Sequence, residues 1–314
     1  MRCLSIHLTD LCNSRCSFCV VGAPLMTADG VVYDEVVAFL RENAGRGFNV
    51  VNLHGGEPTA HPRFLETLAL IRELGYPETH VQTNGIRLAN LVFVREAIEL
   101  GVSLFIVSLH GDCARIQDEQ TRTPGGFAQT IAGIGNAIAA GAQVRTNTVV
   151  MRTNLEQLRA ISKLASDLGV NHLNFSNLHP GGSAIFGLSR TLPAFAEIRQ
   201  NLYPAADLAI ARGRRVTLEG FPYCVIKERL ELHLDNEYRD ILMLHRGHVF
   251  RSYEAFMDNA MRTYVDSCER CTVSDACGGV YQEYVDLRGS SEFAPIVTET
   301  GKVVLDNSLA RRAG

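Results

Sequence analysis

Nine cysteines occur in this chain of 314 residues, and six of them fall into two short groups. The first group is Cys12-Asn-Ser-Arg-Cys16-Ser-Phe-Cys19, and the second is Cys268-Glu-Arg-Cys271-Thr-Val-Ser-Asp-Ala-Cys277. Thiols this close along a chain can converge on one metal centre. We therefore expect metal ligands in a reducing compartment rather than disulfides.

The composition excludes several other classes of protein. A mean hydropathy of +0.03 is too high for a disordered chain, and a net charge of −4 argues against a nucleic-acid partner. No apolar run reaches the roughly 18 residues of a membrane span. Charged and polar residues also interrupt the N-terminus before a signal peptide could form. We expect a cytoplasmic protein with no membrane partner.

Apolar strands alternate with helices through the first two thirds of the sequence, which predicts a parallel α/β sheet. Six such units end by residue 176, fewer than the eight of a closed barrel. A further helix and a short strand follow, and the alternation then stops. We expect a partial (βα)6 barrel over residues 1–213 and a small C-terminal domain over 214–314. The predicted strands are 3–8, 50–53, 79–83, 103–109, 144–150, 172–176 and 214–218, and the predicted helices are 33–44, 63–74, 90–100, 126–140, 154–168 and 192–211.

The first cysteine group lies in the loop after the first predicted strand. Three thiolates can bind three irons of a four-iron cluster, which leaves the fourth iron open to a small molecule. Zinc is the alternative, but a structural zinc site takes four ligands and no fourth lies close by. Further motifs follow three later strands: Gly55-Gly56-Glu57-Pro58, Asn84-Gly85 and Ser108-Leu-His-Gly.

These motifs together resemble the radical S-adenosylmethionine (SAM) superfamily over about residues 1–180. The resemblance implies a [4Fe–4S] cluster on Cys12, Cys16 and Cys19, and an electron donor such as flavodoxin or ferredoxin. It implies one-electron cleavage of SAM to a 5′-deoxyadenosyl radical. It also implies SAM contacts from Phe18 (adenine), Gly55, Gly56 and Glu57 (ammonium), Ser108 (ribose or methionyl part), Arg122 (carboxylate), Asn147 and Leu173. The alternatives are a simple turn for Gly55-Gly56, a plain strand-end residue for Ser108, a surface charge for Arg122 and a core side chain for Phe18.

The second cysteine group resembles the auxiliary-cluster segments of the SPASM and twitch subgroups. Cys224, just past the predicted boundary, would complete a set with Cys268, Cys271 and Cys277. The resemblance implies a second [4Fe–4S] cluster, and a zinc site with the same four ligands remains open.

Two cysteines stand outside both sets. Cys3 begins the first strand and is expected to be buried filler. Cys113 follows the fourth strand, where a thiol could return a hydrogen atom to a substrate radical; an incidental loop cysteine is the alternative.

The size and the single auxiliary segment resemble small radical SAM enzymes that act on aminocyclitols and aminoglycosides, of the neomycin C epimerase type. The first predicted strand starts at residue 3, and no peptide-binding segment is predicted before it. This also favours a small-molecule substrate. We therefore expect an epimerase, or else a dehydrogenase, in antibiotic biosynthesis. A peptide-modifying enzyme and a non-catalytic iron–sulfur or zinc protein remain alternatives. Acidic side chains that could bind an aminated sugar, or be merely solvated, are Asp112, Asp118, Glu119 and Glu219.

Overall fold

The structure is a computed structural model, and it describes residues 1–26, 28–233, 240–251 and 261–297. In this part of the chain, one sheet of nine strands has the order β7-β6-β5-β4-β3-β2-β1-β8-β9. Neighbouring strands are parallel except for the antiparallel pair of β8 and β9. The strands are β1 (Arg2–Thr9), β2 (Val50–Gly55), β3 (Glu78–Thr83), β4 (Val102–Ser108), β5 (Gln143–Val150), β6 (His172–Asn177), β7 (Arg215–Glu219), β8 (Asp240–His245) and β9 (His248–Phe250).

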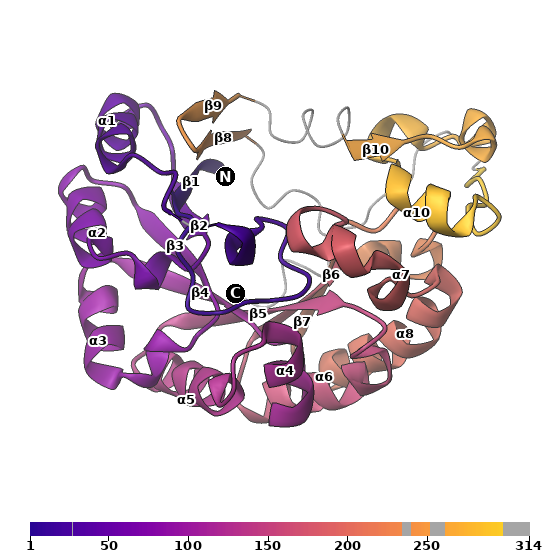
Figure 1. Cartoon of the computed structure of the whole chain (residues 1–314), viewed down its shortest axis with the longest axis horizontal. Helices are drawn as coiled ribbons and strands as arrows, with labels where there is room; N and C mark the ends of the chain where they lie inside the picture. Colours follow the sequence, from indigo (N-terminus) through magenta and orange to yellow (C-terminus); the bar gives the residue numbers. More distant parts are fainter. Residues whose placement is uncertain (27, 234–239, 252–260, 298–314) are drawn as a thin grey trace.

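Helices cover the outer face of this curved sheet (Figure 1). They are α1 (Tyr33–Asn43), α2 (Phe64–Glu73), α3 (Leu91–Glu99), α4 (Ala114–Thr121), α5 (Gly126–Ala139), α6 (Leu158–Asp167) and α8 (Phe195–Ala211). Short 3₁₀ helices lie in the connections: η1 (Ala23–Leu25), η2 (Pro58–Ala60), η3 (Arg87–Ala89), η4 (Leu155–Gln157), η5 (Gly182–Gly187) and η6 (Lys227–Leu232). A one-turn helix, α7 (Leu188–Thr191), follows η5.

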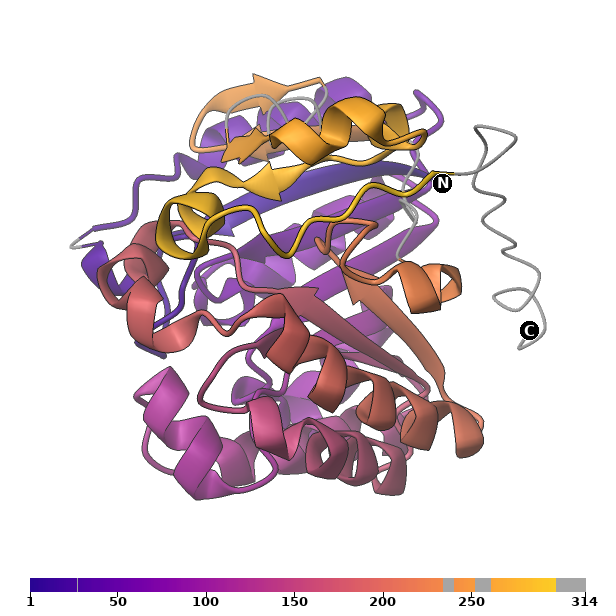
Figure 2. The same cartoon turned by 90° about the vertical axis from the view of Figure 1, so that its right-hand side faces the viewer.

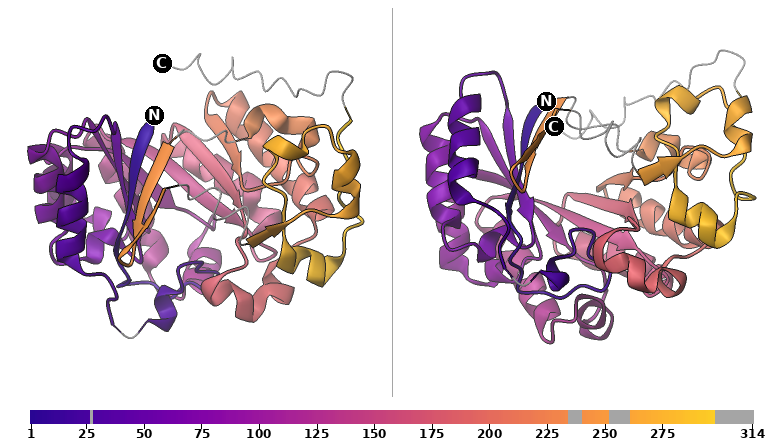
Figure 3. Two further views of the ribbon diagram at one scale, coloured as in Figure 1. Left: turned by 90° about the horizontal axis from the view of Figure 1, so that it is seen from above. Right: turned by 45° about the horizontal axis from the view of Figure 1, so that its top comes forward.

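Side chains alternate between the two faces of each strand, and this alternation places the core. In β1, Leu4, Ile6 and Leu8 belong to the hydrophobic core under the helices, so Ser5 and His7 face the concave side. The concave side is open because β7 and β9 are the two edges of the sheet and do not pair with each other (Figure 3). This confirms the expected partial barrel.

The last described part of the chain is a small unit beside α8 (Figure 2). It contains η7 (Asp266–Arg270), η8 (Ser274–Ala276), α10 (Gln282–Arg288) and a two-stranded sheet of β10 (Arg262–Thr263) and β11 (Val280–Tyr281). The Phe195 and Tyr284 rings stack with centroids 4.1 Å apart, and Glu292 accepts a hydrogen bond from the Ala196 amide at 2.8 Å. These contacts dock the unit on the first turn of α8.

The main sheet continues beyond the boundary expected between residues 213 and 214. Strand β7 pairs with β6, and β8 pairs with β1 at the opposite edge. The sequence pattern predicts no strand after Cys224, because the alternation of strands and helices stops there. The register decides the place of β8: Leu242 pairs with Leu4 and Leu244 with Ile6. Residues 298–314 of the expected C-terminal domain lie outside the described residues.

Within the described residues, no helix is both long and apolar enough to cross a membrane.

Candidate active site

The loop with the first cysteine group leaves β1 and is fixed by backbone hydrogen bonds to two distant segments. The amides of Arg15 and Ser17 donate to the carbonyls of Thr121 and Gln120 at 2.9 and 3.0 Å, at the end of α4. The amide of Ser183 in η5 donates to the Cys19 carbonyl at 2.8 Å. All three thiols are partly buried and outside any disulfide. The fold therefore presents Cys12, Cys16 and Cys19 together on one anchored loop.

Burial disfavours the thiolate form of two of these residues, Cys12 and Cys16. Burial raises the pKa of Cys12 to about 11, and the nearby Glu57 and Cys19 add to the rise. The pKa of Cys16 is also raised, first by burial and then by the charges of Cys19 and Cys12. A positively charged metal centre would offset both effects, since bound iron takes cysteine as thiolate. The donor set therefore fits an iron–sulfur cluster.

The Gly55-Gly56 turn is locked onto the start of the cysteine loop. The Gly56 amide donates to the Thr9 carbonyl at 2.7 Å, and the Glu57 amide donates to the Leu11 carbonyl at 2.7 Å. A Cβ on Gly55 would overlap the Thr9 carbonyl, and one on Gly56 would overlap the Leu11 carbonyl. The backbone that leads to Cys12 therefore excludes a side chain at both positions, and the expected contact of the two glycines with SAM stays a prediction.

The Glu57 carboxylate joins this turn to the end of β3. Its Oε1 accepts from the hydroxyls of Thr59 and Thr83 at 2.6 and 2.7 Å, and its Oε2 accepts from the Asn84 amide at 2.7 Å. Burial raises the pKa of Glu57, and these hydrogen bonds act in the opposite direction. The carboxylate is thus mainly a brace between two loops. If Glu57 binds the SAM ammonium as expected, the contact would be made by Oε2, because Oε2 accepts fewer hydrogen bonds from the protein than Oε1 does.

Phe18 packs inside the site against a buried histidine. Its ring meets the His110 ring edge-on, with centroids 4.7 Å apart. The Nδ1 atom of His110 accepts a hydrogen bond from the Val149 amide at 3.2 Å, and burial lowers the pKa of this histidine to about 3. His110 is therefore a neutral packing partner for Phe18, which is itself a residue of the cysteine loop.

The other expected SAM contacts lie in three different settings. Ser108 and Asn147 are paired in register on β4 and β5 and face the concave side. Leu173 lies in the hydrophobic core under the helices, on the face opposite its neighbour Asn174. This packing does not support Leu173 as a SAM contact, because strand alternation turns it away from the site. Arg122 is exposed and ends α4 in the left-handed conformation at φ 50°.

Cys113 is the partly buried residue that immediately precedes α4, five positions after the end of β4. The Asp118 carboxylate already has a structural role, because it accepts hydrogen bonds from the backbone amides of Gly125 and Phe127, both at 2.7 Å. Glu119 is exposed on α4. Of the acidic side chains expected to bind an aminated sugar, Asp118 is thus a cap for α5. Glu219 ends β7 on the concave side.

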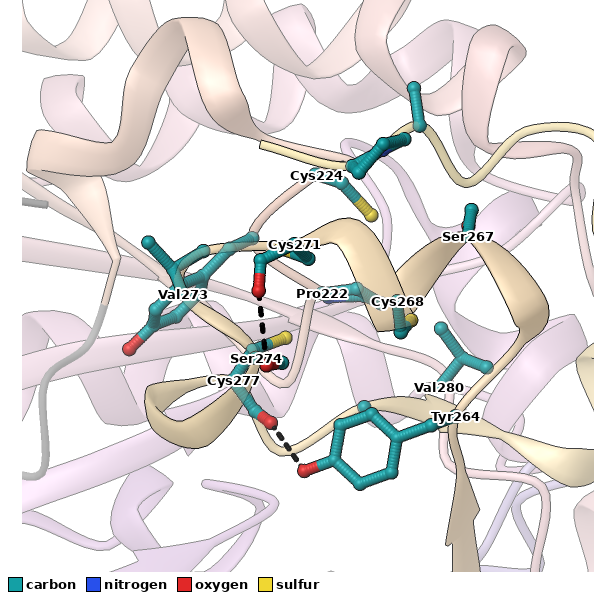
Figure 4. Close-up of a pocket in the computed structure, with 14 residues that line it drawn as sticks. Pro222, Cys224, Tyr264, Ser267, Cys268, Cys271, Val273, Ser274, Cys277 and Val280 are labelled. Atoms are coloured by element: carbon teal, nitrogen blue, oxygen red, sulfur yellow. Dashed lines mark hydrogen bonds between the residues drawn. The ribbon is translucent and has the colours of Figure 1, made fainter. Parts of the chain in front are cut away.

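The second cysteine group and Cys224 line one pocket of the small unit (Figure 4). Burial raises the pKa of Cys224 to about 12, followed in size by the charges of Cys277, Cys268 and Cys271. Four thiols from two distant segments therefore lie close enough to interact. In the described residues, no group of three or more His, Cys, Asp or Glu has the spacing needed for a single metal ion.

Three features that hold the first loop are not among the residues predicted from the sequence. Thr59 and Thr83 bind the Glu57 carboxylate, and Gly182 leaves no room for a side chain against the Cys19 and Val20 carbonyls. Asp10 and Arg246 form an ion pair beside the loop. The position of Asp10, two residues before Cys12, and the Arg-Gly pair after an apolar run were the available signals.

A family model and curated relatives both match the first part of this chain. Residues 6–165, half of the chain, match the model of the radical SAM superfamily. Probable GTP 3′,8-cyclases of Saccharolobus islandicus and Sulfurisphaera tokodaii are 31% and 30% identical over 180 residues. That stretch is 57% of this chain, but only 58% and 56% of the relatives.

Two solved structures share the fold over most of the chain. Streptococcus suis SuiB bound to S-adenosylmethionine has a TM-score of 0.64 at 16% identity, covering 94% of this chain and 76% of SuiB. AdoMet-bound anSMEcpe has a TM-score of 0.64 at 15% identity, covering 94% and 93%. Members of the superfamily use a [4Fe–4S] cluster and SAM, which fits the three thiols on the anchored loop. The chain therefore belongs to the radical SAM superfamily.

Proposed function

We propose that this enzyme directs its SAM-derived radical at a sugar- or aminocyclitol-type small molecule bound on the concave face of the sheet. The supporting observation is a row of hydrogen-bonded polar side chains there. Asn174 donates to Asn147 Oδ1 at 2.9 Å and to Glu219 Oε2 at 2.5 Å, and Thr217 donates to Asn174 Oδ1 at 2.6 Å. Asn174 and Thr217 are buried and hold the more exposed Asn147 and Glu219, whose amide and carboxylate groups would match the hydroxyl and amino groups of such a molecule.

The reaction that we favour is epimerisation. With cluster and SAM bound, the site supplies one-electron cleavage of SAM to methionine and a 5′-deoxyadenosyl radical, which removes a hydrogen atom from the substrate. Cys113 then gives its thiol hydrogen atom to the opposite face of the substrate radical. An electron and a proton restore the Cys113 thiol. Flavodoxin or ferredoxin is the expected electron donor.

Oxidation is the closest alternative from the same start, because the substrate radical could instead give up a second electron. In that case Cys113 has no part in the chemistry. The two reactions therefore differ in what the Cys113 thiol contributes.

Replacing Cys113 with alanine tests this assignment. Cys113→Ala should still form 5′-deoxyadenosine in the presence of substrate, but the inverted product should be lost. In D₂O the unaltered enzyme should place one solvent deuterium at the inverted carbon, because thiol hydrogens exchange with water. The measurements are 5′-deoxyadenosine by chromatography and deuterium by mass spectrometry. If the unaltered enzyme and the variant form equal amounts of an oxidised product that contains no deuterium, the reaction is oxidation and not epimerisation.

A phosphorylated substrate is the second candidate, favoured by a different row on the same face. Arg145, His172 and Arg215 are paired in register on β5, β6 and β7. The two guanidinium groups would suit an anion, whereas burial and these two charges lower the pKa of His172 to about 2 and keep it neutral. Because the relatives are named as probable GTP 3′,8-cyclases, a nucleoside triphosphate is the natural probe. If GTP stimulates 5′-deoxyadenosine formation and aminocyclitols do not, this candidate replaces the first.

We further propose that Cys224, Cys268, Cys271 and Cys277 bind an auxiliary [4Fe–4S] cluster. The support is that four thiols line one pocket and that burial raises the pKa of two of them, Cys224 and Cys277. Their failure to form a single-ion site is compatible with a cluster, because the thiolates of a four-iron cube stand further apart than ligands around one ion.

Metal analysis of Cys277→Ala tests the auxiliary cluster. The reconstituted enzyme should hold roughly eight irons and eight sulfides per chain, and the variant roughly four of each. Formation of 5′-deoxyadenosine should persist in the variant, because the SAM-cleaving cysteines are unchanged. Cys224→Ser provides a second variant with a smaller change in shape. About four irons plus one zinc in the unaltered enzyme would establish a zinc site instead.

A further inference from the structure

Arg246 occupies a backbone conformation that its side-chain type rarely adopts. It and Gly247 form the two-residue turn between β8 and β9, with φ values of 47° and 78°. A tight hairpin turn with positive φ at both central positions ordinarily takes Asn-Gly or Gly-Gly. A long β-methylene side chain in the first position is unfavourable, and such positions concentrate at sites with a function.

The side chain of Arg246 explains why arginine stands there. Its Nη2 and Nε donate to Asp10 Oδ1 at 2.7 and 2.9 Å, and Nε also reaches Oδ2 at 3.2 Å. The Asp10 side chain is 1% exposed. The same carboxylate is bound by His7 Nε2 at 2.8 Å and by the Gly30 amide at 3.0 Å. Arg246, whose side chain is 29% exposed, thus pairs with a buried carboxylate that already accepts hydrogen bonds from two other groups.

The contacts of Arg246 fall on both sides of the cysteine loop. Asp10 lies two residues before Cys12, and the carbonyl of Val21, two residues after Cys19, accepts a hydrogen bond from Arg246 Nη2 at 3.4 Å. The same hairpin also packs the His245 ring against His7, with centroids 4.4 Å apart. One guanidinium therefore spans the two ends of the loop that carries the cluster ligands.

We propose that Arg246 is a positioning residue for the SAM-cleaving cluster, through which the β8–β9 hairpin fixes the geometry of the Cys12–Cys19 loop. The hairpin lies outside residues 6–165, the segment that matches the family model. The β8–β9 hairpin, which lies outside the matched family domain, therefore helps to form the SAM site. This inference rests on membership of the superfamily and is independent of the substrate and of the auxiliary cluster.

The matched control is Arg2, which pairs with Asp240 at the other end of the same strand. The Arg2→Ala variant weakens the docking of β8 without touching the cysteine loop. Arg246→Ala and Arg246→Lys remove the guanidinium completely or replace its two-pronged contact with a single one. Each protein is reconstituted anaerobically and its thermal unfolding is also measured without iron.

The decisive readouts are the EPR spectrum of the reduced cluster before and after SAM addition, its midpoint potential, and 5′-deoxyadenosine formation without substrate. In Arg246→Ala we expect a weakened SAM-induced EPR change, a shifted potential and a rate lower by about tenfold or more. Arg246→Lys should be intermediate, and Arg2→Ala should match the unaltered enzyme. If Arg246→Ala does not fold, the same measurements are made on Arg246→Lys and Asp10→Asn.

Unaltered EPR spectra and rates in the folded Arg246 variants would overturn the proposal. Equal losses in Arg2→Ala and Arg246→Ala would also overturn it, because they would show that only the docking of β8 matters. Since no readout needs a substrate, failure of the proposed reaction would leave this result standing.

Discussion

Cys16→Ala is expected to abolish 5′-deoxyadenosine formation under every reducing condition. Cys16 lies between the other two thiols of the loop, and its loss leaves two protein ligands for a cluster that needs three. The iron bound by the chain should fall by roughly four atoms, the content of one cluster. Both quantities are measured after anaerobic reconstitution, with sulfide analysis and the EPR signal of the reduced protein as independent checks.

Cys3→Ala is the matched control for this change. Cys3 lies near Cys16 in the sequence, but it is fully buried in β1 and belongs to neither set of predicted cluster ligands. Its replacement should lower stability modestly through lost packing, while iron content and 5′-deoxyadenosine formation stay unchanged. Full activity in Cys16→Ala would remove this loop from the site of SAM cleavage.

Gly56→Ala is expected to have the second largest effect, although it removes no ligand. The added methyl would overlap the Leu11 carbonyl and lie 2.7 Å from the Asp10 carbonyl. Because both are backbone atoms, the turn or the cysteine loop must shift. The cost of such overpacking is about 1–3 kcal/mol, and the displaced loop should bind less iron and cleave SAM more slowly. Thermal unfolding of the iron-free protein and metal analysis separate the two consequences.

Gly135→Ala provides the control for this substitution. Gly135 lies inside α5, and an added Cβ there meets nothing within 4 Å. Alanine in a helix interior is favoured over glycine by up to about 1 kcal/mol, so this variant should be slightly stabilised and fully loaded with iron. Equal unfolding temperatures and iron contents for the two variants would contradict the steric role of Gly56.

The sequence by itself was sufficient for the family and for most of the sheet. Three cysteines at short spacing and Gly-Gly-Glu-Pro after the second strand are local patterns, and strands such as β1 and β5 show a period of two that needs no partner to be read. Cys224 also lies in one pocket with the second cysteine group, and its role as a cluster ligand stays a prediction. Local spacing carries this information because ligands close in sequence must be close in space.

Only the tertiary structure decided what each motif touches. The Gly55-Gly56 turn proved to be tight against β1, the Glu57 carboxylate was taken by Thr59, Thr83 and Asn84, and Leu173 turned to the core. Strand β8 and the Arg246 contact to Asp10 join residues more than 200 positions apart. Such pairings depend on the register of strands that are distant along the chain, and no local pattern in a single sequence encodes that register.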